Sequence, residues 1–213
     1  MRKTTERSAD AVELDRVSLP GPGDGGVTLA AALRGRRSVR AFLPESLELG
    51  QVADLLWAAQ GATHGDGMRA APSAGKLYPL RTYLVAGVVR GLAPGIYGYD
   101  SAAHVLEPVM EGDVREELGR VAQNQDWLAA ASVVVVFTAD YREPMRKYGE
   151  RAVHYVDLEV GHAVENVCLQ AVALGLGSTV VGRFHDDEVR RLLRASELER
   201  PLCLVPVGVP ADA

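Results

Sequence analysis

The segment from Glu150 to Leu174 restricts the possible fold more than any other part of the chain. It contains no proline, and apolar side chains recur along it at the spacing of an α-helix. One apolar stripe consists of Val153, Val156, Val160, Val164, Val167, Ala171 and Leu174. Apolar side chains also lie off this stripe, at Tyr155, Leu158, Ala163, Cys168, Leu169 and Val172. A helix that is apolar nearly all round must be buried nearly all round.

Two arrangements can bury such a helix. The chain has 213 residues, which fits one domain, so few other elements are available to surround the helix. In one arrangement the helix lies between its own sheet and a second copy of the chain, which predicts a homodimer. In the other it lies wholly inside the monomer. We favour the homodimer.

The rest of the sequence predicts an α+β protein. Residues 1–27 are polar and then rich in proline and glycine, which predicts an extended N-terminal arm before a single domain at 28–213. Helices are predicted from Thr28, as N-cap, to Arg34, from Ser46 or Glu48 to Gln60 with Gly61 as the stop, and over 113–123. Strands are predicted over 81–89, 95–100, 104–110, 132–139, 180–184 and 202–209. The first three strands should form an antiparallel meander, and 132–139 is apolar enough to be buried on both faces.

Charge and composition exclude several classes of protein. The 23 Lys+Arg residues against 28 Asp+Glu leave a net charge of −5, which argues against a nucleic-acid-binding protein that relies on bulk positive charge. No run approaches the roughly 18 consecutive apolar residues that a membrane helix needs, and the N-terminus lacks the apolar stretch of a signal peptide. We therefore expect no membrane association and a cytoplasmic location. Cys168 and Cys203 lie in apolar runs and are expected to be small buried side chains rather than a disulfide.

The long helix also carries two pairs of residues at the spacing of metal ligands. His154 with Asp157, and His162 with Glu165, are three residues apart and could each share one face of the helix. A metal site on helices usually needs a matching pair from another helix, and none of the other predicted helices carries one. No metal site is therefore predicted.

Arg36, Arg37, Ser38 and Arg40 form the first of three segments with candidate ligand-binding chemistry. Arg36 and Arg40 are four residues apart and would converge on one anion if the segment were helical. A guanidinium group matches phosphate oxygens in bidentate fashion, and the Ser38 hydroxyl adds a donor. The alternative is a solvated basic turn, which the spacing alone favours.

The other two segments are a loop and a connection. The loop from Arg69 to Pro79 is built from small residues and two prolines, which would let its backbone approach a flat ligand closely; a plain structural loop explains it equally well. The connection over 175–184 joins the long helix to a predicted strand. Gly177 is a good helix stop, and the missing side chain of Gly182 would leave its N–H free to face a cofactor.

Together these segments resemble a known family. The motif R-R-S-x-R-x-F begins at Arg36, P-S-A-G-x-x-x-P follows at Pro72, and the long helix ends in A-L-G-L-G before V-V-G-x-F at Val180. Their order and spacing resemble those of the flavin-dependent nitroreductase superfamily. The branch that is most similar is that of the SagB-type dehydrogenases, the oxidases of azole-forming peptide-modification systems. The likeness covers roughly Leu19 to Pro210.

The resemblance implies a nitroreductase-like α+β fold, with a central mixed or antiparallel sheet flanked by helices. It also implies an interlocked homodimer around the long helix, with two FMN sites at the subunit interface. Residues Arg36, Arg37, Ser38 and Arg40 would hold the FMN phosphate and ribityl chain. The other subunit would line the flavin ring with the backbone of Ser73, Ala74 and Gly75, with Lys76 nearby. The pyrimidine edge and N5 would lie near Val181 and Gly182.

The resemblance also implies a catalytic pair of residues. In two respects, however, this sequence differs from the pattern of the family. Lys147 and Tyr148 match a Lys-Tyr pair that this branch uses in catalysis, whereas spacing alone favours a surface pair that caps the long helix. Many superfamily members carry basic residues after the last strand that reach the phosphate, but this chain ends at Ala213. SagB-type proteins are also often longer at the N-terminus. Without the C-terminal basic residues, phosphate binding would depend more on Arg36, Arg37 and Arg40. The shorter N-terminus puts a peptide substrate in doubt.

The expected function is FMN-dependent oxidation of an azoline, such as thiazoline or oxazoline, to the azole in a peptide or a related small molecule. A cyclodehydratase is a possible partner, and oxygen a plausible final acceptor. Two alternatives stay open. One is reduction of nitro compounds or quinones by NAD(P)H, and the other is a flavin-binding scaffold subunit of a biosynthetic complex.

Overall fold

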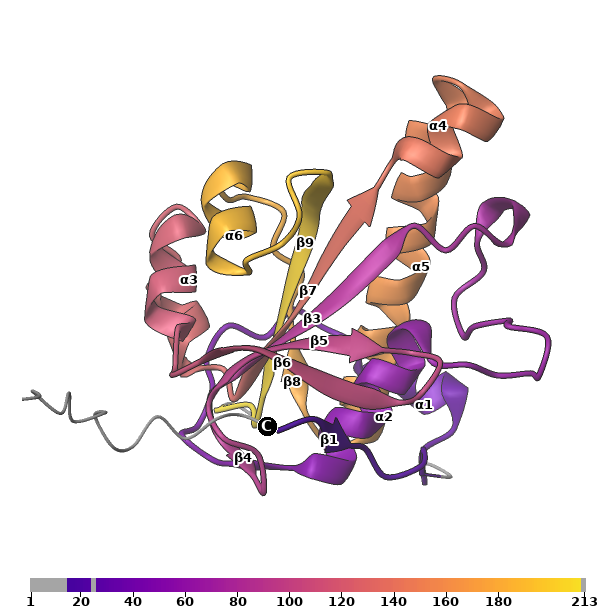
Figure 1. Cartoon of the computed structure of the whole chain (residues 1–213). Coiled ribbons are helices and arrows are strands. Elements are labelled where there is room, and N and C mark those ends of the chain that lie inside the picture. Colours follow the sequence, from indigo (N-terminus) through magenta and orange to yellow (C-terminus); the bar gives the residue numbers. More distant parts are fainter. Residues whose placement is uncertain (1–14, 24–25, 212–213) are drawn as a thin grey trace, which may run out of the picture.

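The centre of the structure, a computed structural model that describes residues 15–23 and 26–211, is a seven-stranded sheet (Figure 1). Its strands, in the order in which they lie side by side, are β1 (Val17–Ser18), β6 (Val105–Glu111), β5 (Gly95–Asp100), β3 (Leu80–Ala86), β7 (Val133–Asp140), β9 (Glu199–Gly208) and β8 (Gly177–Ser178). Each neighbouring pair is antiparallel. A separate short pair, β2 (Leu47–Glu48) and β4 (Val89–Arg90), is parallel.

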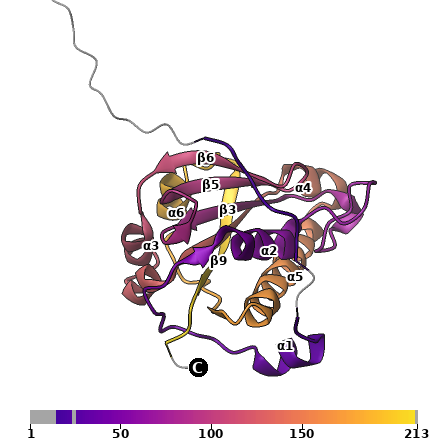
Figure 2. The ribbon, with the colours of Figure 1, turned by 90° about the horizontal axis from the view of Figure 1, so that it is seen from below.

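Helices cover both faces of the sheet (Figures 1 and 2). They are α1 (Leu29–Gly35), α2 (Leu49–Gln60), α3 (Arg115–Val121), α4 (Arg142–Tyr148), α5 (Arg151–Ala173) and α6 (Asp186–Leu192), with short 3-10 turns at Ala74–Lys76 and Asp126–Ala130. Helices α2 and α5 pack side by side on one face, as Figure 2 shows from below, and α3 and α6 cover part of the other. The predicted α+β class, with a largely antiparallel sheet flanked by helices, is confirmed.

Strand β7 joins the two hydrophobic cores. Its residues from Val133 to Ala139 are all buried, as predicted for this apolar run. Because side chains alternate along a strand, Val135 and Phe137 pack toward α2 and α5, while Val134 and Val136 pack toward α3 and α6. Burial of each such side chain stabilises the fold by about 1.5–3 kcal/mol.

Helix α5 confirms the predicted long helix but is not enclosed within the chain. Val156, Val164 and Val167 of the predicted stripe are buried against α2 and the sheet. Val153 and Leu158 are instead 41% and 47% exposed. Helix α5 therefore carries apolar side chains that nothing in the described part of this chain covers, so the arrangement with the helix wholly inside the monomer is not the one observed.

The ends of the first two helices follow the predicted capping residues. Thr28 is the N-cap of α1, and its hydroxyl accepts a hydrogen bond of 3.2 Å from the N–H of Ala31. Glu48 is the N-cap of α2, where it forms a capping box with Gln51, and Gly61 follows the last residue. Local sequence therefore determines where these helices begin and end.

The predicted strand over 180–184 is wrong. Only Val181 bridges the sheet, through two hydrogen bonds of 2.8 and 2.9 Å with Leu204, and the strand next to β9 is β8 instead. Beyond Val181 the chain turns toward the end of α3. The carbonyl of Arg183 accepts from Gln125 at 3.0 Å, and the N–H of His185 donates to Val121 at 3.0 Å. These groups are therefore bonded to another part of the fold and do not extend the sheet.

The described part of the N-terminal segment runs along the edge of the sheet. Val17 and Ser18 form β1 against β6, and the N–H of Leu19 donates to the carbonyl of His104 at 3.1 Å. Further on, the N–H of Gly23 donates to the Asp54 carboxylate of α2 at 2.7 Å. Most of the predicted arm, residues 1–14 and 24–25, lies outside the described residues.

Candidate active site

The loop between α2 and β3 has a backbone that most residues avoid. Gly75, Lys76 and Tyr78 have φ angles of +62°, +57° and +47°. Left-handed conformations are uncommon for residues other than glycine and cluster at functional sites. The hydroxyl of Ser73 accepts from the N–H of Tyr78 at 2.9 Å, and the Tyr78 hydroxyl accepts from the N–H of Arg69 at 3.2 Å. These bonds hold the predicted Ser73–Lys76 segment in its unusual path.

Lys147 and Tyr148 pack directly onto this loop. They end α4, and Gly149, with φ +56°, turns the chain into α5. A Cβ atom on Gly75 would overlap both the Lys147 Nζ and the Tyr148 hydroxyl. The ring of Tyr148 makes an edge-to-face contact with Tyr155 at 5.1 Å between centroids. The fold therefore brings together two segments that are some seventy residues apart in the sequence, and only glycine at position 75 leaves the room.

Behind the loop lies a buried carboxyl group that no sequence motif indicated. Glu159 of α5 is 2% exposed, and its Oε1 has no hydrogen-bond partner. Burial raises the pKa of Glu159 to about 7, although a hydrogen bond with Ser73 and the charge of Arg69 oppose the shift. A small cavity beside it is also lined by Ser73, Tyr148 and Tyr155. The signal in the sequence is one acidic residue on the otherwise apolar inner face of α5.

The arginine-rich segment lies next to β8 and is extended rather than helical. Ser38 forms a parallel bridge with Ser178, and the N–H of Val39 donates to the Ser178 carbonyl at 2.9 Å. The convergence of Arg36 and Arg40 by helical spacing is therefore not observed. In an extended chain, alternate residues share a face, so Arg36, Ser38 and Arg40 fall on one side.

Two further contacts fix this segment. The guanidinium of Arg40 lies 6.0 Å from the centroid of the Trp127 ring. Val39 packs so tightly on Gly177 that a Cβ atom there would lie 2.7 Å from a Val39 methyl group. Val181 is buried beside Leu204, whereas Gly182 is exposed and open space surrounds the position of a Cβ atom. Arg36–Arg40 therefore lie beside β8, which follows the C-terminal end of α5, and Val181 packs on the α3 and α6 side of the sheet.

The two groups of predicted residues lie at opposite ends of α5 (Figure 1). Ser73–Lys76, Lys147 and Tyr148 are at its N-terminal end, and the arginine segment follows from its C-terminal end through β8. A 23-residue helix rises about 33 Å. One copy of the chain thus assembles each group but does not bring the two groups together.

Comparison with known proteins identifies the family. The nitroreductase family model matches residues 33–209, and the chain belongs to this family of oxidoreductases, whose members generally bind a flavin, typically FMN. A protein of Methanocaldococcus jannaschii that is assigned to the nitroreductases is 39% identical over 182 residues, which is 85% of this chain and 91% of that protein.

Two solved structures extend the comparison. A nitroreductase-family protein from Ralstonia eutropha superposes with a TM-score of 0.84 at 26% identity, covering 100% of this chain and 97% of that one. A chain of the E. coli microcin synthetase complex, solved with truncated pro-MccB17 bound, has the same fold, with a TM-score of 0.71 at 21% identity over 97% of this chain and 84% of that one. Within residues 15–23 and 26–211, no helix is both long and apolar enough to cross a membrane.

Proposed function

We propose that this protein is an FMN-dependent oxidoreductase that dehydrogenates an azoline ring, in a peptide or a related small molecule, to the azole. The observation that carries the proposal is the contact of Lys147 and Tyr148 with the strained loop at Gly75. A lysine amine and a phenol packed against such a loop are suited to proton transfer beside a flat ligand. The microcin synthetase structure, which contains a bound peptide precursor and shares the fold, supports a peptide substrate and a cyclodehydratase partner.

The chemistry of the residues present suits FMN. Arg36, Arg37, Ser38 and Arg40 would bind the phosphate and ribityl chain, since guanidinium and hydroxyl donors match phosphate oxygens. Gly182 has open space at its Cα and can present its N–H to the edge of a ring, beside Val181. The backbone of Ser73, Ala74 and Gly75, with Lys76, would line the ring from the other side.

A dimer is proposed because the site would be incomplete without it. The arginines and the Lys-Tyr pair lie at opposite ends of α5, so one FMN can contact both groups only if they come from different copies. Exposed apolar side chains on the outer face of α5 and on α1 support such an interface, since Leu29 and Leu33 of α1 are 66% and 56% exposed.

When bound, FMN supplies a hydride acceptor. Aromatisation of an azoline also releases a proton from the ring. The neutral amine of Lys147 would take this proton directly, or the Tyr148 hydroxyl would accept it while passing its own proton on to the Lys147 amine or to solvent. The exposed Lys147 can pass a proton to solvent, whereas the half-buried Tyr148 is held against Tyr155 and can orient the ring. Oxygen or another acceptor would then reoxidise the cofactor.

Reduction of a nitro compound or quinone by NAD(P)H is equally compatible with the family and the fold, and the same FMN would serve both reactions. A flavin-binding scaffold subunit is the third hypothesis.

The visible spectrum of the freshly purified protein tests whether it binds FMN, and stoichiometric FMN is expected. Assays of an azoline peptide with oxygen, and of NAD(P)H with a nitroaromatic acceptor, then separate the two activities. Failure to bind added FMN would contradict the first two readings, and turnover of the nitroaromatic alone would contradict azoline oxidation.

Mixed dimers test the shared site. We expect the Arg36→Ala/Arg40→Ala variant and the Tyr148→Phe variant each to be nearly inactive as homodimers. In a mixed dimer of the two, one site takes its arginines and its tyrosine from unaltered segments. After equal amounts exchange subunits, about a quarter of all sites should be intact, so activity should return to about a quarter of the wild-type value. If each site came from one chain, mixing would restore no activity.

A further inference from the structure

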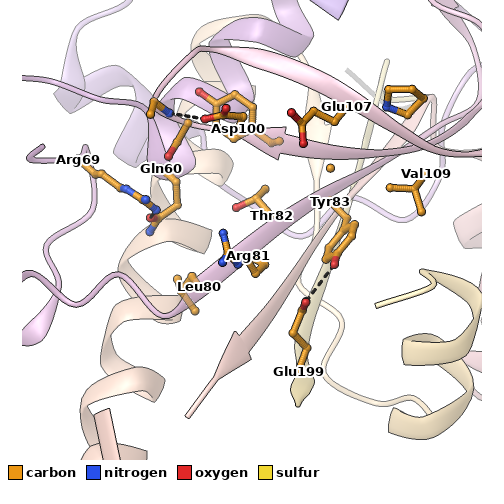
Figure 3. A pocket seen from close by; sticks show the side chains of 15 residues that line it. Gln60, Arg69, Leu80, Arg81, Thr82, Tyr83, Asp100, Glu107, Val109 and Glu199 are labelled. Carbon is orange, nitrogen blue, oxygen red and sulfur yellow. Dashed lines mark hydrogen bonds between the residues drawn. The ribbon is translucent and has the colours of Figure 1, made fainter. Parts of the chain in front are cut away.

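A cavity of about 570 Å³ lies in the wedge where β3 and β5 separate (Figure 3). The two strands pair from Tyr83 to Ala86 and from Gly95 to Gly98, and beyond these residues they are no longer partners. Residues of both strands, of the end of α2 and of the following loop line the space. Its volume is in the range of small-molecule sites. None of the residues proposed to bind FMN or transfer protons lines it.

The acidic groups of this wedge already have partners. The Glu199 carboxylate accepts from the hydroxyls of Tyr83 at 3.0 Å and Thr138 at 2.5 Å. Asp100 accepts from two backbone N–H groups, at 2.9 and 3.1 Å, and lies 3.4 Å from Arg16. Glu107 lies 3.4 Å from the same arginine. The carboxylates of the wedge therefore do not require a cationic ligand.

Several donors that line the wedge are unused. Arg69 is half-buried, and its side chain donates one hydrogen bond, from Nη1 to Gln60 Oε1 at 2.9 Å. Gln60 is 1% exposed, and its Nε2 has no partner. The amide cannot simply be reversed, because its NH₂ group would then face the guanidinium. The Arg81 side chain is exposed and makes no hydrogen bond or ion pair with the described residues. A buried donor without a partner, such as Gln60 Nε2, costs about 1–3 kcal/mol of stability, so a ligand that accepts a hydrogen bond from it is favoured.

We propose that the wedge binds a small organic anion through a carboxylate or phosphate group, with Gln60 Nε2 and the guanidinium groups of Arg69 and Arg81 as donors. Charge supports this assignment, since the positive charge of Arg81 opposes the cationic state of Arg69 and an anion bound between the two side chains would relieve that repulsion. Burial, and to a smaller extent Arg81, lower the pKa of Arg69, while Glu159 opposes the shift. The rings of Tyr83 and Tyr99 form part of the wall and offer apolar surface to the rest of the ligand.

The wedge is connected to the candidate active site through Arg69. Its guanidinium lies 4.6 Å from the centroid of the Tyr78 ring, and its N–H donates to the Tyr78 hydroxyl. Tyr78 belongs to the loop whose Gly75 contacts Lys147 and Tyr148. An anion bound to Arg69 would therefore contact the residue that braces this loop, which makes the wedge suited to a substrate carboxylate or to a regulatory anion.

Titration calorimetry with inorganic phosphate and with succinate tests the proposal, on the protein carrying whatever flavin it retains. At least one probe should bind, and Arg81→Gln should weaken it about ten- to a hundredfold, the value of a hydrogen bond to a charged group. Gln60→Glu should abolish binding without loss of thermal stability, because the new carboxylate pairs with Arg69. The control Arg120→Gln removes an equal charge from exposed α3 and should not change affinity.

The two probes and one further variant decide the source of any signal. Binding of phosphate alone indicates a phosphate ligand, and binding of succinate indicates a carboxylate. Phosphate can also bind at the segment with Arg36 and Arg40, so Arg40→Gln is measured in parallel. Loss in Arg81→Gln but not in Arg40→Gln supports the wedge. Loss in Arg40→Gln alone, equal affinity in Arg81→Gln and wild type, or no binding of either probe overturns the proposal.

Discussion

Lys147→Ala and Tyr148→Phe are each expected to lower turnover of an azoline substrate by about 10²- to 10⁴-fold while FMN stays bound. The reason is that proton removal must accompany loss of the hydride, and these two side chains carry the exchangeable protons that contact the Gly75 loop. Neither residue belongs to the proposed phosphate-binding segment, so the flavin spectrum and the stoichiometry should stay as in the wild type. Turnover under single-turnover conditions, with flavin absorbance as the signal, measures the effect.

Matched controls exist on the same helix. Arg146→Ala removes a neighbouring exposed cation of α4, and Tyr141→Phe removes a hydroxyl at its start; both should leave turnover unchanged. A fall in flavin content in the Lys147 and Tyr148 variants would assign the pair to binding instead of proton transfer. Wild-type turnover in both variants would refute the catalytic assignment.

Replacing Glu159 by glutamine should change how stability depends on pH. The carboxyl group has a pKa of about 7 in the folded protein, above its ordinary value of 4.5. The folded state therefore keeps its proton to higher pH than the unfolded state does. The contribution of this group to the free energy of unfolding is complete below pH 4.5 and is lost as the pH rises to about 7. The loss amounts to about 3 kcal/mol, because a tenfold difference in proton affinity between the folded and unfolded states corresponds to about 1.4 kcal/mol.

Glutamine is neutral throughout this range and does not incur the loss. The free energy of unfolding of Glu159→Gln, measured in urea, should therefore gain about 3 kcal/mol relative to the wild type between pH 4.5 and pH 8. Glu165→Gln, at an exposed position of the same helix, serves as control and should follow the wild-type pH dependence. Parallel curves for Glu159→Gln and the wild type would mean that the buried carboxyl group ionises normally.

Local patterns in the sequence were sufficient for much of the fold. The proline-free apolar segment predicted α5 to within one residue at each end, and Thr28, Glu48 and Gly61 marked the ends of the first two helices. The apolar run in β7 correctly indicated burial on both faces. These signals are local because helix capping and side-chain periodicity depend on residues a few positions apart.

The strand predicted over 180–184 shows where such patterns stop being informative. Its composition suits a strand. However, the Arg183 carbonyl accepts a hydrogen bond from Gln125, and the His185 N–H donates one to the Val121 carbonyl. The pKa of Glu159 likewise could not be predicted from local sequence patterns. Its raised pKa depends on the packing of α5 beneath the loop at Ser73, and no neighbour in the sequence reports that burial.

Helices α1, α2, α3 and α5, the buried central strand and the family motifs could all be predicted from the amino-acid sequence, because each is encoded over a short stretch of chain. Three features could not: the contact of Lys147 and Tyr148 with Gly75, the place of the arginine segment at the far end of α5, and the wedge that opens between β3 and β5. Each of these depends on hydrogen bonds and packing between distant segments, whose partners the chain meets only after it has folded.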